Sequence, residues 1–450
     1  MKSAFVFLFS FLIPYGYVLG QDTLRLNFDE AVKIALQNNI LLRQEKNNLE
    51  SAIAVERASK AQYLPNLSAS GQAMHLYGQQ FDLVKGDIYF LGSDRVGGSI
   101  TAYYTLFNGM GRYNTLRRSG SLKDSQENLV ERTEQQIIFN VAQQYLQALL
   151  DRELLRIANE NLTNQKTTLR QIEGFVAAGT RPLSDQLNQE AEVERLEVLR
   201  IRAENKLRID KALLSQTLMM EPGIDIDLIE PEWGFESILV QDFALDELYQ
   251  EALASRPDYR KSLTDQNAAF ANLGVARGLH FPTISAFFDY GSNYSSLVTD
   301  QNNERVSFNK QFFEENRTSA LGLQISIPIF DQYRTISQKI QAGSLVENAK
   351  LTEQNMKLTI YREVQNAYLD MAAARNEYLA TQKQFEAAEE ANKIQQERYE
   401  VGVGDLVELS TSVQRFVEAA SSRANAQYTL LFQKVILDYY MGNLNKDDLH

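Results

Sequence analysis

The chain of 450 residues contains no cysteine and only 8 prolines, 3 histidines and 1 tryptophan. Without cysteine it cannot form a disulfide framework, a thiolate metal site or a lipid-modified N-terminal cysteine. The histidines, His75, His280 and His450, are far apart in the sequence, and no nucleophile–base set, phosphate-binding loop or metal-ligand spacing occurs. We therefore expect no enzyme activity, no metal site and no cofactor, and the absence of a histidine or methionine cluster gives no support for metal efflux.

Long hydrophobic runs are also missing. No run approaches the 18 or more apolar residues of a transmembrane helix, so a membrane role would have to come through strands. Residues 1–20 combine Lys2 with an apolar segment from Phe5 to Ile13 and small or apolar residues before Gln21. This pattern predicts a secretory signal peptide cleaved near Gly20, and an uncleaved anchor helix is the alternative. We expect the mature protein to be exported.

Acidic residues outnumber basic ones. The formal net charge is −13 for the whole chain and −14 for residues 21–450, because the predicted signal peptide carries only Lys2. An acidic balance of this size argues against a nucleic-acid partner.

The two halves of the chain repeat one another. An offset of 217 residues aligns Leu64-Pro65 with Phe281-Pro282, and an offset of 223 aligns Gly179 with Gly402. The sequence therefore predicts an internal duplication with six extra residues between the strands of the second copy, where a loop tolerates an insertion best.

Each copy is expected to contain initial helices, two strands and two long helices. The first repeat, residues 21–221, has expected strands at about 66–77 and 97–107 and long helices at about 112–175 and 183–221. The second, residues 243–450, has strands at about 283–294 and 320–330 and long helices at about 333–400 and 405–442. Residues 222–242 are expected to form a less regular connector in the equatorial region, and no proline falls inside a long helix.

The expected strands alternate between apolar and polar residues, as in Leu321–Ile329, where every second side chain is leucine or isoleucine. Their length suits transmembrane strands of roughly 9 to 11 residues, and a soluble sheet with one face on a core is the alternative. Aromatic residues cluster near the strand ends, as at the two interfaces of a bilayer barrel: Phe107, Phe281, Phe330 and Tyr333 at one end, and Tyr77, Tyr290, Tyr294 and Phe312 at the other.

Four strands cannot close a barrel, and an open sheet edge in lipid leaves unpaired backbone groups at a cost of several kcal/mol each. The chain is therefore expected to oligomerise. A dimer would supply eight strands, with a lumen largely filled by side chains, and a trimer would supply twelve, wide enough for a pore.

The long helices carry the 4,3 spacing of a left-handed coiled coil in the same register in both repeats, for example through Ile360, Val364 and Ala367. At about 1.5 Å per residue each would be a rod of roughly 100 Å. We interpret Gln144, Asp151 and Gln165, which occupy seam positions, as parts of a wall with one wetted face. A solvated coiled-coil stalk is the alternative.

Several motifs in this order resemble the outer-membrane efflux proteins of the TolC type. They are Leu64-Pro65-Asn66-Leu67 and Phe281-Pro282-Thr283-Ile284 opening strands, Ile327-Pro328-Ile329-Phe330 closing one, and the segments Phe175–Gly179 and Arg398–Gly402 at helix ends. The resemblance covers essentially the whole chain after residue 20.

This resemblance implies an α+β membrane protein in the outer membrane of a Gram-negative cell envelope, with an extension through the periplasm. Four strands from each copy of a homotrimer would form a 12-stranded transmembrane β-barrel, continued by a long α-helical coiled-coil barrel. The implied function is passive transport as the exit duct of a tripartite efflux or type I secretion system. The implied partners are a periplasmic adaptor (membrane fusion protein), an inner-membrane pump or ABC exporter, and outer-membrane lipid; the cargo cannot be inferred from this chain.

The resemblance also implies roles for the helix tips. Asp185, Tyr399 and Glu408 would take part in a periplasmic aperture, where a threefold ring of carboxylates would favour cations. The adaptor hairpin would dock on Gly179, Thr180, Gly402 and Val403.

Two positions depart from the family pattern. Gly404 stands where a basic residue often latches the tip, and Thr411 stands where a second acidic residue can follow, so a latch here would run through Arg181. Local roles for the acidic residues are alternatives: Asp405 and Glu408 have the spacing of a capping box, and Asp185 would complement the positive end of its helix.

Two other functions compete with the duct. A periplasmic adaptor also has a long coiled-coil hairpin, but it would have one hairpin between globular β modules, whereas this chain predicts two hairpins and amphipathic strands. A structural outer-membrane stalk without conduit activity remains an alternative, because an open lumen is a property of the assembled oligomer.

Overall fold

The computed structural model describes residues 24–81, 86–221, 223–230, 238–239, 244–302 and 304–444. The predicted signal peptide, residues 1–20, lies outside this part, as do residues 222, 231–237 and 240–242 of the predicted connector. The described residues divide into two compact units. The helical unit comprises those up to Ile40, Glu134–Ser255 and those from Arg362 onward, and the sheet unit comprises Leu41–Thr133 and Arg256–Tyr361. Each unit thus contains segments of both predicted repeats.

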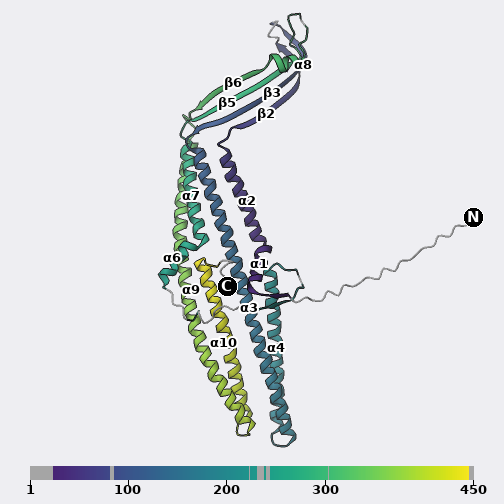
Figure 1. Ribbon diagram of the computed structural model, residues 1–450, viewed down its shortest axis with the longest axis vertical. Helices are drawn as coiled ribbons and strands as arrows, with labels where there is room; N and C mark the ends of the chain where they lie inside the picture. The colour runs from purple at the N-terminus through teal and green to yellow at the C-terminus, as the bar shows by residue number, and fades with distance from the viewer. Residues whose placement is uncertain are drawn as a thin grey trace, which may run out of the picture. The chain divides into compact units, whose positions relative to one another are not determined.

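The helices recur along the chain at the two offsets seen in the sequence (Figure 1). At 217 residues, α1 (Phe28–Asn38) and α2 (Ile40–Ala61) correspond to α6 (Leu245–Ser255) and α7 (Pro257–Gly278). At 223 residues, α3 (Gly111–Ala177) corresponds to α9 (Arg334–Glu400), and α4 (Leu183–Thr217) and α10 (Leu406–Met441) begin at matching positions. With 67 residues each, α3 and α9 measure about 100 Å.

The expected helix at 183–221 ends earlier than predicted, at Thr217. Met219 adopts a left-handed backbone with φ of 53°, which an α-helix cannot continue. The sequence offered no glycine or proline at this point to indicate the end.

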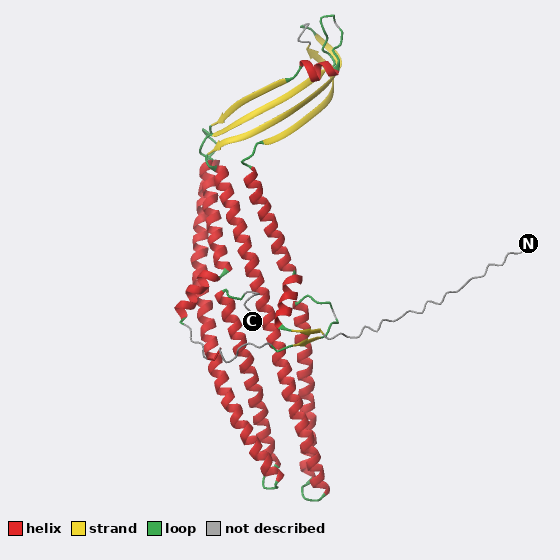
Figure 2. Cartoon of the chain, viewed as in Figure 1, coloured by secondary structure: helices red, strands yellow, loops and turns green. Residues whose placement is uncertain are grey.

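The sheet unit contains one antiparallel sheet of four strands in the order β2–β3–β5–β6 (Figure 2). The strands are β2 (Asn66–Phe81), β3 (Ile88–Asn108), β5 (Thr283–Ser295) and β6 (Thr318–Ser326). Each repeat contributes one pair of antiparallel strands, β2–β3 and β5–β6. Pairing of β3 with β5, in which Ile100 lies opposite Tyr290, joins the two pairs into one sheet. Within the chain, β2 and β6 are therefore the two edges of this sheet.

The two faces of the sheet differ in chemistry. The register places Ile100, Phe288 and Leu321 on one face, which we call the apolar face, and these side chains are 45%, 41% and 81% exposed in the single chain. On the opposite face, the Thr101 hydroxyl donates to Asp289 over 2.7 Å, and the hydroxyls of Ser70 and Ser99 lie 2.9 Å apart. We call this the polar face.

Three strand boundaries differ from the sequence predictions. β2 and β3 extend beyond the predicted residues 66–77 and 97–107, because their distal ends continue to pair as far as Phe81 and Ile88. The strand predicted at 320–330 instead spans Thr318–Ser326. Pro328 has no backbone N–H to donate to a strand ladder, so strand pairing ends before it. The alternating sequence pattern of residues 327–330 therefore lies beyond the last paired residue.

The connection between β5 and β6 contains a short helical insert, which spans α8 (Phe308–Lys310) and the π-helical turn η1 (Gln311–Glu315). Phe312, which the sequence analysis assigned to an aromatic girdle at the strand ends, belongs to this insert and not to a strand.

In the helical unit, Tyr145 of α3 is fully buried, and its hydroxyl donates to the Leu26 carbonyl over 2.9 Å. Leu26 belongs to β1 (Leu24–Leu26), which pairs in parallel with β4 (Ile226–Leu228). Asn27 then starts α1 with a complete capping box shared with Glu30. The fully buried tyrosine thus fastens the small parallel sheet to a long helix.

The seam between α3 and α4 contains buried polar groups. Gln189 donates from Nε2 to Oε1 of Gln165 over 2.7 Å, and these side chains belong to residues only 3% and 7% exposed. Asp151, 3% exposed, accepts from Gln147 and lies 3.4 Å from the Lys206 ammonium, which also binds Asp210. In the single chain, Asp151 and Gln165 are therefore satisfied by hydrogen bonds within the seam, and the wetted wall expected from their positions stays a prediction about the assembled protein.

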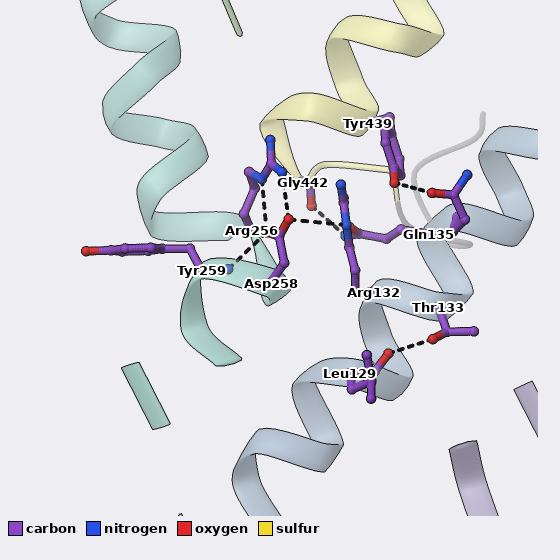
Figure 3. Close-up of polar contacts among 10 residues, drawn as sticks. Leu129, Arg132, Thr133, Gln135, Arg256, Asp258, Tyr259, Tyr439 and Gly442 are labelled. Carbon is purple, nitrogen blue, oxygen red and sulfur yellow. Dashed lines mark hydrogen bonds and ion pairs between the residues drawn. The ribbon is translucent and has the colours of Figure 1, made fainter. Parts of the chain in front are cut away.

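In the sheet unit, an ion-pair cluster holds α7 to α3 (Figure 3). Arg256, 2% exposed, donates to both carboxylate oxygens of Asp258 over 3.0 and 2.6 Å, and the Arg132 Nε lies 3.5 Å from the same carboxylate. Burial alone would raise the pKa of Asp258, but the hydrogen bond from Arg256 and the charges of both arginines hold it below its ordinary value.

Among the described helices, none has a stretch that is both long and apolar enough to cross a membrane.

Candidate functional site

The turns that end the two long hairpins have the same backbone geometry. In the α3–α4 turn, Gly179 has φ of 72° and Thr180 N–H donates to the Phe175 carbonyl over 2.9 Å. In the α9–α10 turn, Gly402 has φ of 77° and Val403 N–H donates to the Arg398 carbonyl over 2.9 Å. This is the Schellman ending of a helix, and its left-handed residue favours glycine. The four predicted docking residues thus occupy equivalent places in the two turns.

Arg181 links the two turns. Its Nη2 donates to the Gly404 carbonyl over 3.2 Å, and its guanidinium carbon lies 5.2 Å from the centre of the Tyr399 ring. A guanidinium at this distance is attracted by the face of the ring. Two of the predicted aperture residues, on different hairpins, are therefore in direct contact.

Tyr399 is 3% exposed although it lies near the end of its helix. It packs with the buried side chains of Ile172 and Leu409, so α3, α9 and α10 share a small apolar cluster beneath the turns. Its buried hydroxyl has no hydrogen-bond partner among the described residues. Burial raises the pKa of Tyr399, the charge of Arg181 opposes this, and the charge of Asp185 adds to it.

The predicted carboxylates have different surroundings. Asp185 is half-buried in the first turn of α4, whose N-cap, Pro182, makes no side-chain cap hydrogen bond. An acidic residue at this point complements the positive end of the helix.

Glu408 is exposed, with its carboxylate 3.5 Å from Nη1 of Arg398. Its N–H donates to the Asp405 side chain over 2.8 Å, which is one half of the capping box suggested by the spacing. The carboxylate is paired with Arg398, across the turn. Sequence reasoning did not select Arg398, because a contact between residues ten apart depends on how the turn folds back.

A polar cavity of about 430 Å³ lies in the helical unit between α3, α9 and α10. Gln165, Asn392 and Gln396 are among its lining residues, and Tyr399 and Leu409 line it as well. The apolar cluster beneath the turns is therefore bordered by a cavity with polar lining residues. Across the described residues, no group of three or more histidines and carboxylates could hold a metal ion.

The sequence matches the family described as "Outer membrane efflux protein" over residues 31–218 and 248–443. It is 25% identical over 383 residues to protein CyaE of Bordetella pertussis, covering 84% of this chain and 76% of that protein. It is 28% identical over 424 residues to the solvent efflux pump outer membrane protein SrpC of Pseudomonas putida, covering 88% of this chain and 82% of the relative.

The fold matches the crystal structure of the outer membrane protein VceC from Vibrio cholerae with a TM-score of 0.77 at 15% identity, covering 92% of this chain and 96% of that one. For the single chain, this likeness confirms the predicted fold of a TolC-like outer-membrane channel. Because the family match spans most of the sequence, the protein belongs to the outer membrane efflux protein family and is located in the outer membrane of a Gram-negative cell envelope.

Proposed function

We propose that the protein is a passive exit duct across the outer membrane and periplasm, in a tripartite efflux or type I secretion system. The observation that carries this proposal is the open, two-faced sheet. Among the residues that the structure describes, its edge strands β2 and β6 have no further strand partner. In lipid, each unpaired backbone group would cost several kcal/mol, so β2 of one copy must pair with β6 of another.

Three copies suit this requirement better than two. Twelve strands enclose a lumen wide enough for a pore, whereas eight are largely filled by their own side chains. In this homotrimer the apolar face meets lipid, and the polar face, which includes Ser70, Ser99 and Thr101, lines the lumen. The lengths of α3 and α9 support a role as the wall of a periplasmic tunnel, since a compact domain has no need of helices of about 100 Å.

The tips supply the aperture in this proposal. Arg181 holds the closed tip through its hydrogen bond to Gly404, and a hydrogen bond from a charged donor contributes about 1.5 to 3 kcal/mol. Its cation–π contact with Tyr399 adds about 1 kcal/mol. An energy of this size is small enough for a docking partner to overcome. Asp185 and Glu408 would form the carboxylate ring that favours cations.

Docking would use the outer surface of the turns. Val401 and Val403 are 74% and 73% exposed, so an apolar surface stands beside Gly179, Thr180 and Gly402. A periplasmic adaptor that covers it would gain the burial of these side chains, roughly 25 cal/mol per Å² of apolar area. The adaptor would in turn connect the duct to an inner-membrane pump or ABC exporter.

Cysteine labelling tests the conduit, since the chain has no cysteine of its own. Ser99 and Ile100 are neighbours on β3 that belong to the polar and the apolar face. A water-soluble charged thiol reagent should reduce the single-channel conductance of trimers with Ser99→Cys and leave Ile100→Cys trimers unchanged. An equal reduction of conductance in both variants would argue against a lumen on this face. So would an unchanged conductance of Ser99→Cys trimers whose cysteine is shown by mass spectrometry to be modified. Inserted trimers without any conductance would favour the structural stalk.

A further inference from the structure

The helical insert of the β5–β6 connection folds back onto the apolar face of the sheet. A Cβ atom added to Gly98 of β3 would lie 3.0 Å from Cζ of Phe312, so the phenyl ring sits directly over this glycine. Ser292 of β5, which pairs with Gly98, donates its hydroxyl to the Phe312 carbonyl over 2.5 Å. Both residues lie on the same face as Ile100 and Tyr290.

Gln311 fixes the insert in this position. It is fully buried, and its Nε2 donates to the carbonyls of Ser295 and Val306 over 3.0 and 2.8 Å. Its Oε1 accepts from the Ser295 N–H over 3.0 Å. A buried amide with three hydrogen bonds to backbone groups holds the turn as a defined structure.

The insert gathers a cluster of aromatic side chains at the distal end of the sheet. The rings of Phe308 and Phe312 stack with their centroids 5.1 Å apart. Tyr294 packs edge-on against Phe308, and Phe313 packs edge-on against Phe312, each with a centroid distance of 5.2 Å. Phe313 is 59% exposed. Charged groups flank the cluster, including the Lys310–Glu315 ion pair at 3.2 Å. Aromatic rings beside polar groups are typical of membrane–water interfaces.

The depth of the cluster fits the interface of a bilayer. From Thr283 to Ser292, β5 advances nine residues. At about 3.3 Å per residue and a tilt of about 40°, this corresponds to about 23 Å along the membrane normal, close to the roughly 25 Å height of a barrel's apolar band.

We propose that the helical insert, residues 308–315, is a membrane anchor whose Phe308 and Phe313 side chains contact the outer-leaflet lipid at its boundary with water. This proposal rests on the barrel proposed above, in which the apolar face meets lipid. The aromatic cluster is continuous with that face. The insert covers the two central strands, β3 and β5, and not the β2 or β6 edge where a second copy would pair, so lipid is the occupant that the geometry favours.

Fluorescence quenching by brominated lipid tests the anchor. Trp233, the only tryptophan, is replaced by Phe, and single tryptophans are introduced as Phe313→Trp, Ile100→Trp and Ser99→Trp. Trimers are reconstituted in vesicles of phosphatidylcholine brominated either near the headgroup or near the chain ends. Phe313→Trp should lose most fluorescence with the shallow bromines. Ile100→Trp, two residues further into the apolar band than Gly98, should also be quenched by brominated lipid, and Ser99→Trp should be quenched weakly by both lipids.

The three positions separate the two proposals. One outcome overturns the anchor alone: Ile100→Trp is quenched, but Phe313→Trp is quenched no more than Ser99→Trp. The barrel proposal would then still hold. If Ile100→Trp is not quenched either, the apolar face does not meet lipid and the barrel proposal fails with the anchor. A Phe313→Trp signal protected from both bromine and aqueous acrylamide would mean that protein covers the insert, which also overturns the proposal. Because Phe313 is largely exposed, tryptophan fits there without disturbing the fold.

Discussion

Replacing Asp151 by Asn should stabilise the protein at neutral pH and have little effect in acid. Burial, together with a hydrogen bond shared with Asp210, raises the pKa of Asp151 to about 6 from 3.8, against the opposing charge of Lys206. The gap of about 2 pKa units corresponds to roughly 3 kcal/mol, at 1.36 kcal/mol per unit. This is an upper bound, because Lys206 loses part of its ion pairing when the carboxylate is removed and because the pKa of the neighbouring Asp210 is shifted in the opposite direction, below its ordinary value.

The direction follows from proton binding. A carboxyl whose pKa is raised by folding binds its proton more tightly in the folded state, so the contribution of Asp151 to wild-type stability falls as pH rises from about 4 to about 6. Asn cannot ionise, yet its amide can still accept from Gln147 and donate to Asp210. The variant should therefore match the wild type at pH 4 and exceed it above pH 6, as measured by denaturant unfolding of the detergent-solubilised protein followed by far-UV circular dichroism.

Asp258→Asn supplies a control of opposite sign. Burial works to raise the pKa of Asp258, but Arg256 and Arg132 outweigh it and keep the pKa below its ordinary value, so ionisation of this carboxyl stabilises the folded state. Its replacement should cost stability at neutral pH, and the cost should shrink as pH falls through the acidic range. If Asp151→Asn were less stable than the wild type at pH 7, or if the difference did not depend on pH, the reasoning about the buried carboxyl would be refuted.

Other substitutions test the hairpin tips and the core. Gly402→Ala should lower the free energy of unfolding by about 1 to 2 kcal/mol, because Gly402 has a left-handed φ of 77°. Gly174→Ala, in a helical turn with open space around it, should raise it by about 0.5 to 1 kcal/mol. Equal effects of the two substitutions in thermal melts would contradict the turn geometry. Ile172→Ala should cost about 2 to 5 kcal/mol, since its side chain is fully buried beneath the tips, and a cost under 1 kcal/mol in the same melts would mean that the cluster does not form. Asn27→Ala should remove the cap of α1 and cost about 1 kcal/mol, and an unchanged denaturation midpoint would count against the capping box.

Periodicity was enough to predict most of the fold. The 4,3 spacing predicted long helices whose observed ends, as at Gly111 and Glu400, differ from the expected ones by few residues. Alternation predicted the strands, because side chains on a two-faced sheet must alternate whatever packs against them. It failed at residues 327–330, where the pattern continues but Pro328 cannot pair.

The contacts of the site were less accessible to sequence reasoning. Glycines at Gly179 and Gly402 indicated turns, since a left-handed helix ending favours this residue. Arg181 contacts Tyr399 because the two turns fold next to each other. The residue spacing within either turn does not predict this contact. The hydrogen bonds of Asp151 with Lys206 and of Gln165 with Gln189 likewise join two helices, so their seam positions alone suggested contact with water.

Single-channel conductance of the purified trimer in a planar bilayer tests the central claim most directly. Wild-type trimers held closed by Arg181 should give small, intermittent, cation-selective steps, and Arg181→Ala should give larger and steadier ones. Arg170→Ala, a change at an exposed arginine of α3 away from the Gly404 contact, should behave as the wild type. If trimers of Arg181→Ala insert into the bilayer and pass no ions, the protein is not a conduit and the account is contradicted.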